Sequence, residues 1–258
     1  MNYQSEPDIS PSRNWVMKQS DLKALKFIVV FVVVLLITQW VGGLIAYHYA
    51  ETKIIEGIES HLGGNFYPEL SDNYWFLRLP AIPPEIGQLN NIEGLYVTQQ
   101  RITTLPPEIG SLKNLTHLNL WRNNLKRLPP EIGGLEQLTF LYLVNNRVTE
   151  VPSEIGQLMN LNELHLENNR LIRLPSEIGQ LSQLEELYLN DNRLTELPPE
   201  ISQLLNLRVL HLHNNNLTSL PVELVKLPNL ETLTIVGNKI EEIPHELLEK
   251  PDLEIWKE

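Results

Sequence analysis

The sequence predicts an α/β solenoid, a curved stack of short coils with a parallel β-sheet on its concave face and short helical or irregular segments on its convex face. Three observations lead to this prediction. A Pro-Pro-Glu-Ile-Gly motif begins at Pro83 and returns in related form, with a constant 23-residue period, up to Pro244. Leucines spaced as LxxLxLxxNxL fill the intervals between these motifs. A separate apolar run over residues 27–47 adds one N-terminal transmembrane helix to the prediction.

The run FIVVFVVVLLITQWVGGLIAY, residues 27–47, contains no charged residue. At about 1.5 Å of rise per residue, a helix of this length spans roughly 30 Å, the thickness of the hydrocarbon core of a bilayer. A cleaved secretory signal is the alternative interpretation. Two features weigh against it: the long leader before the run, and His48, which lies where a cleavage site needs a small residue. We therefore predict an uncleaved membrane anchor.

Basic residues indicate the orientation of this anchor. Arg13, Lys18, Lys23 and Lys26 precede it, whereas Lys53 is the only basic residue in the twenty residues after it. Positively charged flanks of membrane helices stay in the cytoplasm. Residues 1–26 are therefore predicted as a cytoplasmic tail, with the repeat domain on the far side of the membrane, periplasmic or extracellular. The reversed topology stays open as an alternative.

Residues 48–82 are predicted to form a juxtamembrane linker and a cap over the first coil. The stretch ETKIIEGIESHL has apolar residues at helical spacing, and the aromatic-rich FYPELSDNYWFLRL follows it. A contact of the aromatic stretch with lipid or a partner is the alternative. Within the anchor, Gly42 and Ala46 form a small-xxx-small pair of the kind that lets two helices approach closely. This pair suggests a weak homodimer.

Residues 83–258 are predicted to form the repeat domain, with seven full 23-residue repeats and a truncated eighth. The full repeats begin at Ile92, Leu115, Leu138, Leu161, Leu184, Leu207 and Leu230, and the eighth begins at Leu253. In each repeat Leu-x-Leu is expected to form a short strand with its leucines inward. Proline cannot continue a β-ladder, so the return path should be irregular or a short helical turn. The recurring Asn can donate and accept at once, which predicts a hydrogen-bonded ladder along the stack.

These motifs, LxxLxLxxNxL and LPxEIGxL in a 23-residue period, resemble those of leucine-rich repeat proteins. The resemblance is to the class found in plant intracellular Ras-group proteins, in Ras-suppressor and Scribble-type proteins, and in bacteria. It implies a curved solenoid that acts as a binding module, with partners that differ from one member to the next. Extracellular animal and plant members usually carry cysteine caps, which this sequence lacks, so the resemblance favours a bacterial origin.

Composition and motifs exclude several functions. The formal net charge is −12, and a uniformly acidic body without a basic stripe disfavours nucleic acid. The chain has no cysteine, which excludes disulfides, thiolate metal sites and thiol nucleophiles. It contains no phosphate-binding loop, dinucleotide glycine pattern, HExxH motif or serine elbow. We therefore expect a protein that is not an enzyme and that needs no cofactor or metal.

The outward strand positions vary from repeat to repeat, which makes them candidates for partner binding. The candidate residues on the concave face are His117, Asn119, Trp121, Phe140, Tyr142, Glu163, His165, Glu167, Glu186, Tyr188, His211 and His213. Among them Trp121, Phe140 and Tyr142 form an aromatic patch. Rigid aromatic anchors are typical of recognition surfaces. Cross-strand stacking that only stabilises the sheet is the alternative explanation.

Acidic and imidazole side chains follow this patch. A metal site at His211 and His213 is disfavoured, because no carboxylate is obviously adjacent to both. A pH-sensitive contact with a basic partner is the better hypothesis, in which His165, His211 and His213 would become charged near pH 6 to 7.

The sequence thus predicts a membrane-anchored solenoid that binds a protein or peptide on its concave sheet face. A structural or self-associating spacer is the first alternative, since the unfinished eighth repeat would leave an open end at Ile255 and Trp256. A cytoplasm-facing signalling scaffold is the second, if the topology is reversed.

Overall fold

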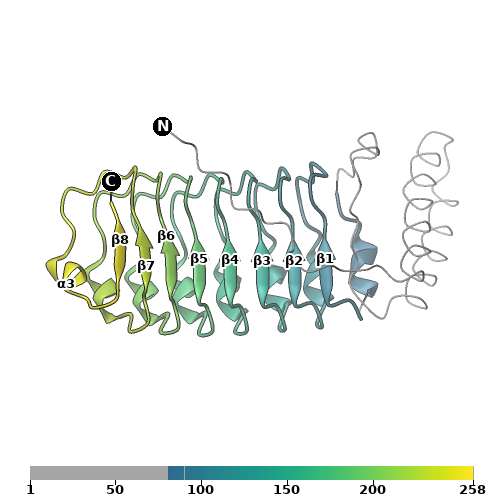
Figure 1. Ribbon diagram of the computed structural model, residues 1–258. Coiled ribbons are helices and arrows are strands. Elements are labelled where there is room, and N and C mark those ends of the chain that lie inside the picture. The colour runs from purple at the N-terminus through teal and green to yellow at the C-terminus, as the bar shows by residue number, and fades with distance from the viewer. Residues whose placement is uncertain (1–80, 90, 258) are drawn as a thin grey trace, which may run out of the picture. The chain divides into compact units, whose positions relative to one another are not determined.

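The computed structural model describes residues 81–89 and 91–257 and shows a single sheet of eight parallel strands in chain order. The strands lie side by side along one face of the stack (Figure 1). They are β1 (Gly94–Tyr96), β2 (His117–Asn119), β3 (Phe140–Tyr142), β4 (Glu163–His165), β5 (Glu186–Tyr188), β6 (Val209–His211), β7 (Thr232–Thr234) and β8 (Glu254–Trp256). Each of β1 to β7 begins one residue earlier than the predicted Leu-x-Leu. Equivalent residues pair directly, as Leu118 does with Leu141 and Leu141 with Leu164.

Short 3₁₀ turns carry the return path, as the prolines predicted. They are η2 (Pro84–Gln88), η3 (Pro107–Ser111), η4 (Pro130–Gly134), η5 (Ser153–Gln157), η6 (Ser176–Gln180), η7 (Pro199–Gln203) and η8 (Val222–Lys226), followed by the α-helical turn α3 (His245–Leu248). A proline precedes each turn with extended ψ. Its carbonyl accepts the first hydrogen bond, as in Ile132 N to Pro129 O at 3.0 Å. Proline suits this place because the first N–H groups of a helix have no partner inside it.

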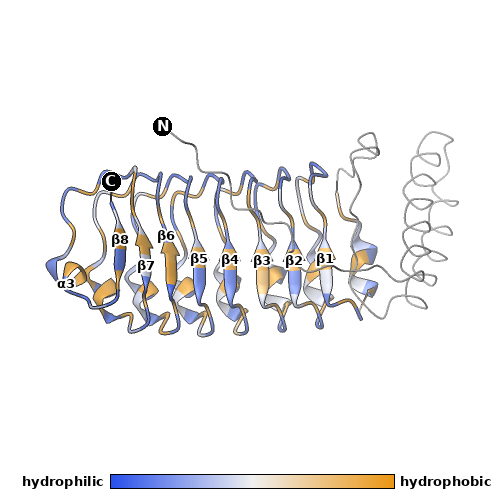
Figure 2. Ribbon diagram, viewed as in Figure 1, coloured by the Kyte–Doolittle hydropathy of each residue, from blue (hydrophilic) through white to orange (hydrophobic). Residues whose placement is uncertain are grey.

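The core consists of the leucine and isoleucine columns between strands and turns. Leu118 and Leu120 from the strand side are fully buried, as are Ile132 and Leu135 from the return side, as predicted. Figure 2 shows the alternation of hydrophobic and hydrophilic residues along the coils. Glycine allows the turns to pack closely: a Cβ on Gly110 would lie 2.3 Å from the Glu131 carbonyl oxygen of the next coil. The apolar side chains of one coil are thus buried by the adjacent coils, as is typical of a solenoid.

The predicted asparagine ladder is present, and its hydrogen bonds run to the backbone of two coils. The Nδ2 group of Asn169 donates to Leu166 O of its own coil at 3.0 Å and to Leu143 O of the preceding coil at 2.9 Å. Its Oδ1 accepts from Val148 N of the preceding coil at 2.9 Å. The same pattern recurs at Asn123, Asn146, Asn192, Asn215 and Asn238.

The residue before each ladder position has a left-handed backbone conformation. This column consists of Gln99, Arg122, Asn145, Asn168, Asp191, Asn214 and Gly237, with φ between 53° and 71°. Glycine, asparagine and aspartate tolerate this conformation best, which accounts for most of the column. The turn directs the chain from the strand to the return path once in every coil.

The last coil departs from the 23-residue spacing. Leu233 pairs with Ile255, and Thr234 pairs with Trp256, so the step from β7 to β8 is one residue shorter than the earlier steps. A strict period would have placed Trp256 at the inward position of Leu233. The shorter step instead turns Ile255 toward the core and leaves Trp256 outward with an exposed fraction of 54%. The larger ring thereby stays out of a column that elsewhere holds leucine.

The predicted cytoplasmic tail 1–26, the membrane helix 27–47 and nearly all of the linker 48–82 lie outside the described residues. Among the residues that the structure describes, no helix is long and apolar enough to cross a membrane. The curvature of the solenoid and the N-terminal membrane helix therefore stay predictions.

We expect Asn169→Ala to lower the free energy of unfolding by about 3 kcal/mol or more. It removes the partners of three buried backbone groups, each of which costs about 1–3 kcal/mol when left unsatisfied. Chemical denaturation followed by circular dichroism measures the effect. The matched control is Asn160→Ala, because the exposed Asn160 makes one bond to the preceding coil, from Nδ2 to Glu136 O. Equal losses in the two variants would contradict the role assigned to the ladder.

Candidate functional site

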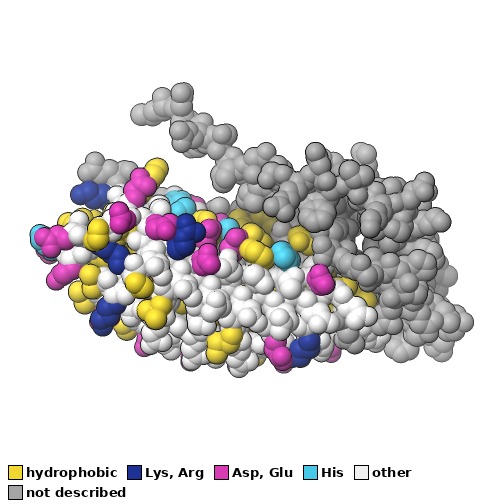
Figure 3. All heavy atoms as spheres, turned by 60° about the horizontal axis from the view of Figure 1, so that its bottom comes forward, with side chains coloured by type: hydrophobic (Ala, Val, Ile, Leu, Met, Phe, Trp, Pro, Cys, Tyr) yellow, Lys and Arg dark blue, Asp and Glu magenta, His cyan; other side chains and the backbone are white. Residues whose placement is uncertain are grey.

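The outward residues of β2 to β6 form a continuous surface, which we call the strand face. All twelve residues predicted from the sequence lie on it or directly beside it, and all twelve are half-buried. Because the strands pair in register, Tyr142, His165, Tyr188 and His211 occupy the same position in four consecutive strands. Figure 3 shows histidine and acidic side chains interleaved with hydrophobic ones in a band across the described surface.

The rings of this column stack on one another. His165 lies between Tyr142 and Tyr188, with ring centroids 4.4 Å and 4.2 Å apart. His211 meets Tyr188 edge-on at 4.8 Å. At the other end Phe140 stacks on His117 at 4.5 Å and on Tyr142 at 6.5 Å. The cross-strand stacking considered as an alternative from the sequence is thus present, and it makes the column rigid.

Glutamate carboxylates form hydrogen bonds with the polar atoms of these rings. The Tyr142 hydroxyl donates to Glu163 Oε2 at 2.7 Å, and the Tyr188 hydroxyl donates to Glu186 Oε2 at 2.5 Å. His165 lies between two carboxylates, with Nε2 3.3 Å from Glu163 Oε2 and Nδ1 3.0 Å from Glu167 Oε1. Every polar ring group of the central column from β3 to β5 therefore has a fixed partner.

The remaining predicted residues lie toward the two ends. The Asn119 Oδ1 atom accepts from Trp121 N at 3.0 Å. Trp121 pairs with Arg122, whose guanidinium carbon lies 4.3 Å from the ring centroid. The aromatic patch predicted from Trp121, Phe140 and Tyr142 thus consists of a Phe140–Tyr142 pair and a separate Trp121–Arg122 pair.

His213 approaches two residues that the sequence analysis had not selected. Its Nδ1 lies 3.1 Å from Thr234 Oγ1, and its Nε2 lies 3.9 Å from Asp191 Oδ2. Asp191 also accepts hydrogen bonds from Asn190 and Asn214. Like Arg122, Asp191 belongs to the left-handed column, one residue beyond the last outward strand position considered. The recurrence of Asn, Asp and Gly in that column was the sequence signal for it.

His165 and His211 differ in protonation state at neutral pH, so the hypothesis that these two histidines become charged together near pH 6 to 7 is wrong. Burial lowers the pKa of His165, but hydrogen bonds to Glu163 and Glu167 and the charges of these groups outweigh it and raise the pKa to about 9. Burial and the neighbouring histidines lower the pKa of His211 to about 4. At neutral pH His165 is charged and His211 is neutral.

The same contacts shift the pKa values of Tyr142, Tyr188 and Glu163. Burial, together with hydrogen bonds to Glu163 and Glu186, raises the pKa values of Tyr142 and Tyr188 well above the usual range. The hydrogen bond to His165 lowers the pKa of Glu163. The strand face therefore carries ionised glutamate, protonated His165 and neutral phenols around neutral pH.

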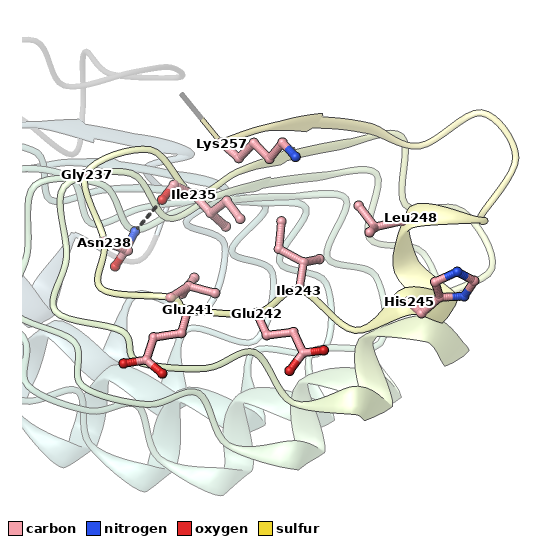
Figure 4. Close-up of a pocket in the computed structure, with 10 residues that line it drawn as sticks. Ile235, Gly237, Asn238, Glu241, Glu242, Ile243, His245, Leu248 and Lys257 are labelled. Carbon is pink, nitrogen blue, oxygen red and sulfur yellow. Dashed lines mark hydrogen bonds between the residues drawn. The ribbon is translucent and has the colours of Figure 1, made fainter.

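Within residues 81–89 and 91–257, no three histidine or acidic side chains converge in a way that could hold a metal ion. A cavity of about 440 Å³ lies away from the strand face, beside the end of the stack (Figure 4). Its wall includes Ile243 and Leu248, which extend toward it, and the side chain of Lys257. It lies beside the last coil and is separate from the ring column, which consists of Phe140, Tyr142, His165, Tyr188 and His211.

We expect the protein to lose stability as the pH rises from 6.5 to 9. The folded pKa of His165 is raised above its usual value of 6.5, so its stabilising effect is complete below pH 6.5 and is lost as the pH passes about 9. A difference of one pH unit between the folded and unfolded pKa corresponds to about 1.4 kcal/mol, so the loss is on the order of 3 kcal/mol. Urea denaturation across this pH range measures it.

The variant His165→Gln should lose most of this pH dependence. The matched control is His211→Gln, which should keep it, because the pKa of His211 lies near 4 and this residue titrates in the folded protein below the range tested. If both variants keep the slope of the parent protein, His165 is not its source.

Two family models match this chain. The model of the leucine-rich repeat region matches residues 81–167 and 108–197, and a second leucine rich repeat model matches residues 182–240. Comparison with curated protein sequences gives no match.

Solved structures of similar fold come from bacteria and plants. A leucine-rich repeat protein of Leptospira interrogans has 36% identity and a TM-score of 0.61, covering 72% of this chain and 56% of its own. The plant peptide hormone receptor RGFR1 in complex with RGF2 has 30% identity and a TM-score of 0.62, covering 69% of this chain and 30% of its own. The ectodomain of the Arabidopsis thaliana receptor kinase GASSHO1/SCHENGEN3, in complex with CASPARIAN STRIP INTEGRITY FACTOR 2, has 32% identity and a TM-score of 0.51, covering 69% and 25%.

The match thus spans less than two thirds of the length of each of these proteins. The two family models together cover residues 81–240, which include β1 to β7 and the asparagine ladder. This chain belongs to the leucine-rich repeat family.

Proposed function

We propose that the strand face binds an extended segment of a protein or peptide. The observation that carries the proposal is the ring column from Phe140 to His211, which is rigid before any partner arrives. The leucine core is complete without it, since Leu141, Leu164 and Leu187 beneath it are fully buried. A fixed surface of aromatic side chains loses little conformational entropy on binding. The receptors RGFR1 and GASSHO1/SCHENGEN3 were solved in complex with RGF2 and CASPARIAN STRIP INTEGRITY FACTOR 2, which supports this kind of partner.

The charges beside the column favour a basic partner. Glu163 and Glu167 flank His165, and Glu186 lies beside Tyr188 in the next strand, so this part of the strand face carries more acidic than basic groups. Opposite charge across an interface contributes specificity and speeds association. Binding, rather than catalysis, is the activity that this arrangement supports, because the polar ring groups from β3 to β5 already have hydrogen-bond partners and are not activated as nucleophiles.

The proposal includes a membrane anchor at residues 27–47, with the solenoid on the far side of the membrane and residues 1–26 in the cytoplasm. The uncharged run and the basic residues before it support this topology. A cytoplasm-facing scaffold is the competing arrangement.

The strand face can be tested with peptides selected from a random display library on the purified protein. The double variant Tyr142→Ala/Tyr188→Ala should weaken binding of the selected peptides by about tenfold or more, because buried aromatic anchors dominate interface energies. The variant Tyr142→Phe/Tyr188→Phe keeps both rings and should retain most of the affinity. Calorimetry gives the dissociation constants.

The control for this test is Met159→Ala/Leu205→Ala, which removes two exposed hydrophobic side chains that lie outside the strands. Its affinity should match that of the parent protein. Selected peptides that bind the tyrosine-to-alanine variant as well as the parent protein would refute binding on the strand face.

The topology can be tested by labelling, because the natural chain has no cysteine. With Ser219→Cys, an exposed position of the solenoid, a membrane-impermeant maleimide should label intact bacterial spheroplasts. Labelling that appears only after the membrane is opened would establish the reversed topology.

A further inference from the structure

Two columns of charge run along the solenoid outside the strand face. The first is acidic: a glutamate lies in the first turn of every return segment, at each 23rd residue from Glu85 to Glu246. The second follows the ladder asparagine by one residue. It consists of Arg101, Arg147, Arg170, Arg193 and Lys239, all exposed, with Asn124 and Asn216 in the two remaining coils. An acidic chain thus carries a basic row.

The backbone fixes the basic column at one residue per coil. The N–H groups of Arg147, Arg170 and Arg193 each donate to a carbonyl of the preceding coil at 2.9 Å. The charged groups therefore follow one another with the spacing of the coils, about 5 Å on the strand side.

The acidic column is fixed in the same way by close contacts between return segments. A Cβ on Gly133 would lie 2.6 Å from the Glu154 carbonyl oxygen, and one on Gly156 would lie 2.7 Å from that of Glu177. The two columns consequently follow the same coils with the same repeat, and they carry opposite charge.

In the part of the chain that the structure describes, no ion pair involves a member of either column. Some surface charges outside the columns are paired, as in Lys113–Glu136, Arg127–Glu150 and Arg208–Glu231. Charges of one sign in a row repel one another, so each column gains from an external row of opposite charge.

We infer that the solenoid associates laterally with a second copy of this chain, the basic column of one copy lying along the acidic column of the other. With the two solenoid axes side by side, Arg147, Arg170 and Arg193 face the partner's Glu154, the partner's Glu177 and the partner's Glu200 in register. A single exposed ion pair contributes little, but a row of pairs in register forms a network. An anionic polymer would match the basic column alone, whereas a second copy satisfies both columns.

This contact is heterologous, because two different columns meet. Each pair of copies keeps one free column at either side, so the contact can be repeated and can extend into a row of molecules. The ring column takes no part in it and stays available to a ligand.

Sedimentation velocity of the full chain in detergent tests the inference. Self-association is expected at about 50 mM sodium chloride and should weaken at least about tenfold at about 500 mM, where screening shortens the reach of charges to a few ångströms. The variant R147E/R170E/R193E and the variant E154K/E177K/E200K should each fail to associate alone. Mixed in equal amounts they should associate, because each then offers a column that the other lacks.

The control K113E/R208E/K226E reverses three cations outside the columns. Three such changes of −2 each take the net charge from −12 to −18, as in the first variant, so total charge is matched. It should associate like the parent protein, and circular dichroism confirms that each variant is folded. A parent protein that stays monomeric at low salt, or a mixture of the two column variants that does not associate, would overturn the inference. Association that is insensitive to salt would do so too, and would point to the membrane segment.

Discussion

The hydrogen bonds of the ladder asparagines are the constraint on which the rest of this solenoid depends. Burial of leucine is not directional, so it holds the coils together without fixing how one coil sits on the next. The side-chain amide of Asn169 forms hydrogen bonds with Leu143 O and Val148 N of the preceding coil. Because hydrogen bonds require a narrow range of distances and angles, these bonds fix the position of one coil relative to the preceding coil. Because the same link recurs from Asn123 to Asn238, every residue of a coil lies beside its equivalent in the next. Columns of like residues on the surface are therefore a consequence of the ladder.

The ring column shows what this alignment does chemically. Neighbouring parallel strands lie about 4.8 Å apart, close to the distance at which aromatic rings stack. Tyr142, His165 and Tyr188 stack at 4.4 Å and 4.2 Å for this reason. The strand position also places glutamates on both sides of His165, whereas His211 has histidine neighbours. Two histidines at the same position of two coils thus acquire opposite protonation states at neutral pH.

The repeat made most of the fold predictable from the sequence. A 23-residue period fixed which leucines are buried, which residues point outward and where the chain turns, and the structure agrees at Leu118, Leu120 and Ile132. The period failed at its end, because a final step that is one residue short exchanges the roles of Ile255 and Trp256. The protonation of His165 and His211 was not predictable either, since it depends on distances between side chains of neighbouring strands. The same holds for Trp121, which pairs with Arg122 and not with the other rings of the predicted patch.

Charge was the property that the composition described least well. The net charge of −12 suggested a uniformly acidic body. In a solenoid, however, the position of a charged residue within the repeat decides on which surface it lies, so the net charge does not describe the individual surfaces. Position in the repeat places the ring column on the strands, the basic column after the ladder and the acidic column on the return segments. Since a buried apolar core and the asparagine ladder lie between these surfaces, we expect a substitution of an exposed side chain in one column to leave the geometry of the others intact. A chain of this kind can therefore bind a ligand on its strands and a second copy on its edges at the same time, because the two contacts use different repeat positions of the same coils.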